Sequence, residues 1–124
     1  MLRNTLIFIP MLFGLLMGSL AFLAPEIIGG ILGVSADNAA GRGTMVGDFG
    51  AVFFVGAGAS ALALFKGKSH LLWVPISLFG ITIIGRLFDI IASGFGPGAG
   101  QPIIIELILV AMLFTALKLS KKEA

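Results

Sequence analysis

Four long apolar runs, separated by short polar or glycine-rich stretches, make up most of the sequence. They cover approximately residues 2–24, 40–65, 70–92 and 102–119. A helix needs about 20 apolar residues to cross the hydrocarbon layer of a bilayer, and each run is close to that length or above it. The pattern therefore predicts an all-α, transmembrane four-helix bundle that forms a single domain over residues 1–124.

The first connection contains a further short apolar pattern. Pro25 ends the first run, and residues 26–34 place Ile27, Ile28 and Ile31 at helical spacing. This spacing predicts a short interfacial helix after the first span, lying at the membrane surface. Asp37 or Asn38 follows as an expected N-cap of the second span, because a short side-chain oxygen can accept from the free N–H groups of a first helical turn.

The other two connections are also short. Ser69 is the expected cap of the third span. Residues 93–101 are rich in glycine and predict a flexible turn, and Pro102 is expected at the first position of the fourth helix. Gly14 and Gly18 lie four residues apart in the first span, a spacing that predicts close contact with a second helix.

Composition supports a membrane protein. Hydrophobic residues make up 58% of the chain, charged residues 11%, and the mean hydropathy is +1.13. Soluble domains have about a quarter of their residues charged. The four spans leave no long polar stretch for a nucleic-acid module or a separate enzyme domain, and the absence of cysteine excludes disulfides and thiolate sites.

The basic residues predict the topology. Of the eight lysines and arginines, six flank the spans on one side: Arg3, Lys66, Lys68, Lys118, Lys121 and Lys122. The excess of lysine and arginine in short cytoplasmic segments predicts that both termini and the loop at residues 66–69 are cytoplasmic. We therefore expect a multi-pass protein of the bacterial inner membrane.

Five of the remaining charged residues, near the opposite ends of the spans, form the candidate site: Arg42, Asp48, Arg86, Asp89 and Glu106. At about 1.5 Å per residue, Asp48 lies roughly 12 Å inside the end of its span and Arg86 roughly 9 Å, while Asp89 and Glu106 lie roughly 5 and 6 Å inside. A charge that faces lipid at such depths is costly, so Asp48, Arg86 and Glu106 are expected to turn inward and form one cluster. Two interpretations stay open: a structural ion-pair cluster, or a pocket for a ligand or ion.

The chain also resembles a known family. The resemblance rests on the opening of the second span, on Gly-Arg late in the third span, on the glycine- and proline-containing loop and on a glutamate early in the fourth span; the matching residues are Arg42, Gly47, Gly85, Arg86 and Glu106. These features resemble the bacterial four-span membrane family catalogued as domain of unknown function four-three-four-five. Asp48 stands where members of that family often have glycine. The resemblance implies the four-span fold and the charged site, and no activity, because that family has none established.

Three functional classes fit these observations. The preferred hypothesis is a non-enzymatic binding or accessory protein, whose polar pocket holds a lipid, a lipophilic ligand or a membrane-protein partner. The second is a small proton- or cation-coupled transporter with Glu106 as the proton carrier. The third is an intramembrane enzyme that uses Asp48, Asp89 and Glu106 as acid and base, with Arg86 holding an anionic group. We expect no metal, no other cofactor and no nucleic-acid partner; besides the lipid bilayer, a weak homo-oligomer through the glycine faces is a further candidate interaction.

Overall fold

The computed structural model describes residues 1–123, with side chains up to Lys121, so the side chain of Lys122 lies outside the described part. Helices and short connections account for all of it. In chain order the elements are α1 (Leu2–Leu23), α2 (Pro25–Leu32), α3 (Ala39–Thr44), the π-helical turn η1 (Met45–Phe49), α4 (Gly50–Lys66), the 3-10 turn η2 (Ser69–Leu72), α5 (Trp73–Ser93) and α6 (Gly100–Glu123).

Four helical stretches are long and apolar enough to cross a membrane. They are Leu2–Leu23, Ala39–Lys66, Ser69–Ser93 and Gly100–Lys121. The second stretch runs continuously through α3, η1 and α4, and the third through η2 and α5. Many large apolar side chains on their surfaces are exposed, as expected for helices that face lipid. The predicted all-α bundle of four spans is confirmed.

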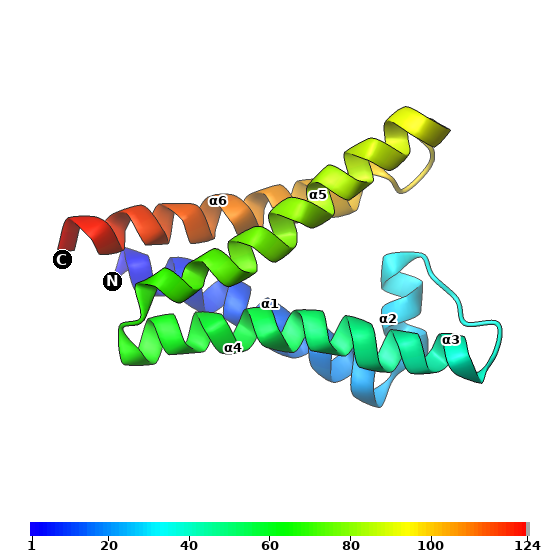
Figure 1. Ribbon diagram of the computed structural model, residues 1–124, viewed down its shortest axis with the longest axis horizontal. Coiled ribbons are helices and arrows are strands. Elements are labelled where there is room, and N and C mark those ends of the chain that lie inside the picture. The colour runs from blue at the N-terminus through cyan, green and yellow to red at the C-terminus, as the bar shows by residue number, and fades with distance from the viewer. Residues whose placement is uncertain (124) are drawn as a thin grey trace.

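The four spans form a ring in which each packs against two others. Helix α1 packs against α4 and α6, and α5 packs against the same two helices. Both termini and η2 lie at one end of the molecule, which we call the basic end, and the connections α2 and 94–99 lie at the opposite end, the loop end (Figure 1). At the basic end the helices enclose an apolar core: Ile7, Ala63, Leu72, Ile76, Phe79, Leu109, Leu113, Ala116 and Leu117.

Arg3 joins the elements of the basic end. Its Nε donates a hydrogen bond to the hydroxyl of Ser120 on α6, and its Nη2 donates to Ala63 O of α4 at 3.2 Å and to Ser69 Oγ at 3.1 Å. The prediction that Ser69 caps the third span is wrong, since no side chain caps η2 or α5 and Ser69 Oγ accepts from Arg3. One guanidinium thus connects the start of the chain to three later elements.

The contact between α1 and α4 depends on glycine, as predicted. A Cβ atom on Gly14 would lie 2.9 Å from the carbonyl oxygen of Phe53 and 3.0 Å from Ala57 Cβ, and one on Gly18 would lie 2.8 Å from the ring of Phe54. Side chains larger than hydrogen would therefore push the two helices apart. This face of α1 is occupied within the chain, so it is not available to a second copy.

The predicted short helix after the first span is present as α2. It begins at Pro25 and ends at Gly33, whose φ of 73° is a left-handed conformation that favours glycine. Ile28 is fully buried against Met17, Ala21 and Met45, so α2 is fixed to α1 and η1. The predicted cap of the second span is also confirmed, because Asn38 Oδ1 accepts from the N–H of Gly41 at 2.9 Å.

At the loop end, the ring of helices opens. Helix α5 leads away from α4 and from α2 as it approaches residue 93 (Figure 1). Helix α6 then begins at Gly100, so Pro102 occupies the first turn and not the first position that was predicted. Because the second span and α5 separate here, Asp48 on η1 and the charged residues of α5 are not brought together.

Candidate functional site

A charge pair links α5 and α6 near the loop end. Arg86 Nε donates a hydrogen bond to Glu106 Oε1 at 2.9 Å. Glu106 is buried, with 8% of its surface exposed, whereas the side chain of Arg86 remains 32% exposed. It is the only ion pair among the residues that the structure describes.

The antiparallel arrangement of α5 and α6 places the two residues at the same depth. Arg86 lies seven residues before the end of α5 and Glu106 six residues after the start of α6. At about 1.5 Å per residue, both lie roughly 10 Å from the ends of their helices. A lone charge at this depth is costly, so each residue lowers the free-energy cost of placing the other there. The predicted pairing of Arg86 with Glu106 is present.

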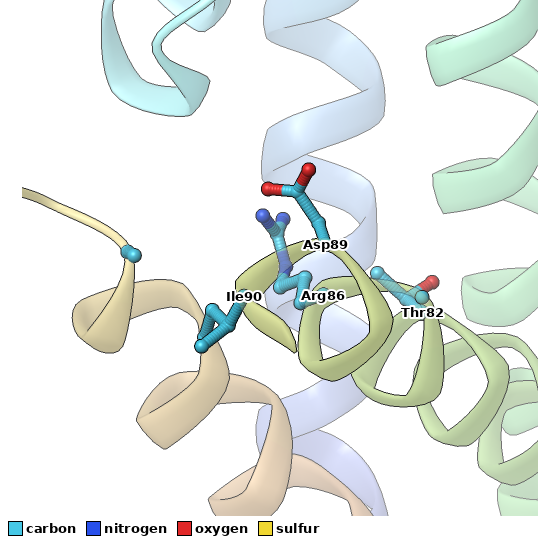
Figure 2. A pocket seen from close by; sticks show the side chains of 6 residues that line it. Thr82, Arg86, Asp89 and Ile90 are labelled. Carbon is cyan, nitrogen blue, oxygen red and sulfur yellow. The ribbon is translucent and has the colours of Figure 1, made fainter. Parts of the chain in front are cut away.

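A cleft of about 480 Å³ lies beside this pair. Its lining comes from one face of α5 and from the connection that follows it: Thr82, Gly85, Arg86, Asp89, Ile90 and Ala99. Figure 2 shows the guanidinium of Arg86 and the carboxylate of Asp89 extending from the same side of α5. The space beside Gly85 is open, since a Cβ atom there would meet nothing within 4 Å beyond its own turn of helix.

Several polar atoms around the cleft keep unused hydrogen-bonding capacity. Among the described residues, Nη1 and Nη2 of Arg86 donate to no protein acceptor, and Asp89 forms no ion pair. The hydroxyl of Thr82 donates to Leu78 O at 2.7 Å, which leaves its oxygen free to accept. Glu106 Oε2 is buried and has no hydrogen-bond partner. The cleft can therefore offer donors from Arg86 and acceptors from Asp89 and Thr82 to a bound molecule.

The structure does not bring all five predicted site residues together. Asp48 is exposed on the π-helical turn η1, and the prediction that it turns inward to join Arg86 and Glu106 is wrong. There are two causes. The wider π-helical turn changes the face of the helix that Asp48 occupies. In addition, α5 diverges from the second span at the loop end (Figure 1). Arg42 is exposed on α3, also away from the cleft.

Three residues have a structural role that the sequence did not indicate: Arg3 had been used only for the topology, Gly85 only for the family resemblance, and Ala99 had not been singled out. Gly85 and Ala99 line the cleft, and Arg3 holds the basic end together. Gly85 could have been found from its position one residue before Arg86, on the stripe that includes Thr82 and Asp89. Ala99 and the contacts of Arg3 depend on how distant segments meet, and no local signal in the sequence indicates them.

Among the side chains that the structure describes, which extend to Lys121, no group of three or more His, Asp or Glu residues is placed to hold a metal ion. The one histidine, His70, is exposed at the opposite, basic end. Comparison with protein-family models, curated proteins and solved structures finds no match to this chain. The fold and the geometry of the cleft therefore carry the functional argument.

Proposed function

We propose that this protein binds an amphiphilic molecule, such as a lipid, in the cleft beside Arg86. The observation that carries the proposal is which N–H groups of the Arg86 guanidinium are hydrogen-bonded. Glu106 fixes it through Nε, while Nη1 and Nη2 remain unused at the cleft. Two parallel N–H donors on a fixed arginine suit a phosphate or carboxylate group, which they can hold bidentately.

The size and surroundings of the cleft support the same proposal. A volume of about 480 Å³ is within the range of about 300 to 1,000 Å³ that is common for small-molecule sites. Ile90 and Ala99 line the cleft together with the polar groups and offer an apolar surface for hydrocarbon chains. Polar groups at one level and apolar side chains around them are what an amphiphile requires.

Binding fits the packing better than transport does. Between the cleft and the basic end, the space among the helices is filled by the apolar core, which includes Phe79, Leu109 and Leu113. A carrier would need a path through this region. The unpartnered Oε2 of Glu106 is the one feature that favours the second candidate, a proton-coupled transporter, and proton flux into proteoliposomes that is lost in Glu106→Gln would support it.

The cellular setting belongs to the same proposal. The protein would lie in a bacterial inner membrane with its basic end in the cytoplasm, which places the cleft toward the outer leaflet. Membership of the four-span family that the sequence resembles would be consistent with this setting. The alternative form of the proposal is an accessory role, in which a membrane subunit binds at the cleft in place of a lipid. The experiment below distinguishes the two.

Native mass spectrometry of the protein from mild detergent tests the proposal. The wild type should retain a co-purifying amphiphile, and Arg86→Gln and Gly85→Leu should weaken its binding about tenfold, a loss of about 1.4 kcal/mol that lowers its occupancy. The first variant removes the donors, and the second fills the cleft.

Matched controls are Arg42→Gln and Gly58→Leu, because Arg42 and Gly58 are exposed and lie outside the cleft. Both controls should keep the wild-type occupancy. Equal occupancy in all four variants would contradict the proposal. A bound protein subunit in place of lipid, lost in the same two variants, would instead support the accessory role.

A further inference from the structure

Arg86 and Asp89 carry opposite charges on the same face of α5, and they do not pair with each other. They are three residues apart and both line the cleft (Figure 2). Residues at this spacing have Cβ atoms about 5 to 6 Å apart, within easy reach for an ion pair. Arg86 instead bonds Glu106 on α6, and Asp89 is left without a cation among the described residues. The cleft therefore presents a separate donor group and a separate acceptor group side by side.

The local charge balance limits what can bind there. Arg86 contributes one positive charge, whereas Glu106 and Asp89 contribute two negative charges, so the site as a whole is negative when both acids are ionised. An anionic headgroup would gain hydrogen bonds from Arg86 but would face the uncompensated carboxylate of Asp89. A headgroup that carries its own cation next to its anion removes this conflict, because opposite charges then face each other at both positions.

We propose that the cleft selects a zwitterionic phospholipid headgroup, with its phosphate on Arg86 and its ammonium on Asp89. This inference rests on the proposed function and specifies its ligand. In an ethanolamine headgroup two carbon atoms separate the phosphate oxygen from the ammonium, a spacing comparable to that between neighbouring side chains on a helix.

The depth of the cleft and its neighbours agree with a lipid source. Asp89 lies four residues and Arg86 seven residues before the end of α5, or roughly 6 and 10 Å. The headgroup layer is about 5 to 8 Å thick on each side of a bilayer. If the end of α5 lies at the bilayer surface, Asp89 and Arg86 are near the boundary between headgroups and acyl chains. Ile90 and Ala99 also line the cleft and would contact the chains.

A lipid competition measured by native mass spectrometry on the full chain in detergent tests this inference. Phosphatidylethanolamine and phosphatidylglycerol with identical chains are added at equal concentration. We expect the wild type to prefer phosphatidylethanolamine by about tenfold, a ratio within the range of one charge-assisted hydrogen bond. Asp89→Asn should remove the preference, because it weakens the binding of phosphatidylethanolamine and relieves the repulsion of phosphatidylglycerol, whereas Arg86→Gln should weaken both lipids.

Asp48→Asn is the matched control, because it removes the same charge from an exposed residue outside the cleft, and it should keep the preference. Asp89 is exposed and unpaired, so its variant should fold. Equal binding of both lipids by the wild type, or an unchanged preference in Asp89→Asn, would overturn the inference while leaving Arg86-dependent binding, and hence the proposed function, intact. Displacement of lipid by soluble phosphoethanolamine at equal concentration would overturn the assignment to a membrane lipid.

Discussion

At the scale of single residues, two arginines at opposite ends of the bundle are used in different ways. Arg3 donates to Asn4, Ala63, Ser69 and Ser120, so each of its three guanidinium nitrogens has a protein acceptor. Arg86 donates to Glu106 through Nε alone. An arginine whose three nitrogens all donate to the protein stabilises the fold, whereas one that is fixed by a single bond keeps donors for a ligand. This contrast is why we assign the site to Arg86.

The pairing of Arg86 with Glu106 can be measured by a double-mutant cycle. Breaking a buried pair by removing one partner costs about 3 to 5 kcal/mol of unfolding free energy. Because Arg86 is partly exposed, we expect losses near the lower value. Arg86→Leu should cost more stability than Glu106→Leu, because it leaves a buried carboxyl with no partner for either oxygen. The double variant should recover part of the loss. Additive losses in unfolding free energy in detergent would show that the residues are not coupled.

Arg3 should contribute to stability through the geometry of its side chain as well as its charge. Arg3→Lys keeps the positive charge and loses the planar group that reaches Ser120, Ser69 and the Ala63 carbonyl together. We expect a loss of about 1.5 to 3 kcal/mol, the range for hydrogen bonds to charged groups, measured as unfolding free energy in detergent. Lys68→Arg is the control at the same end, where the lysine is exposed and forms no ion pair. A wild-type value for Arg3→Lys would mean that these bonds add nothing beyond charge.

At the scale of elements, the sequence predicts the lengths of the helices and their contacts better than it predicts which face of a helix points into the bundle. The four spans follow from runs of apolar residues, and the contact at Gly14 and Gly18 follows from their spacing. Asp48 was misplaced because the π-helical turn η1 adds a residue to one turn, and a helical wheel drawn at constant period cannot include it. The pairing of Arg86 with Glu106 could be predicted, because the two residues are almost equally far in sequence from the connection between α5 and α6. In antiparallel neighbouring helices this places them at the same depth.

The glycine contact between α1 and α4 makes a testable element-scale prediction. Gly14→Leu should force α1 away from the Phe53 carbonyl and Ala57, and overpacking of this kind costs about 1 to 3 kcal/mol. Gly58→Leu on α4 is the control, because Gly58 is exposed and a Cβ atom there would meet no neighbour within 4 Å. Thermal unfolding in detergent should show a lower midpoint for Gly14→Leu and little change for Gly58→Leu. Equal midpoints would show that the close approach is not required for stability.

At the scale of the whole molecule, the two ends of the bundle differ in packing and in charge. The basic end is closed by Arg3 and the apolar core, and the loop end is open beside Arg86. The sequence indicates which residues share an end, and Figure 1 shows both termini and η2 together as that prediction requires. The opening at the loop end could not be predicted, because it depends on how far α5 departs from α4 and no residue pattern records that separation.

The direction of insertion gives the last prediction. Six of the eight lysines and arginines belong to the basic end, so the positive-inside rule places that end in the cytoplasm and the cleft toward the outside. The native chain has no cysteine, and His70→Cys and Ser93→Cys introduce single thiols at exposed positions of opposite ends without changing any lysine or arginine. A membrane-impermeant maleimide should label Ser93→Cys in intact cells and His70→Cys only after the membrane is permeabilised. The reverse pattern would place the cleft on the cytoplasmic side, and the lipids available to Arg86 and Asp89 would then be those of the inner leaflet.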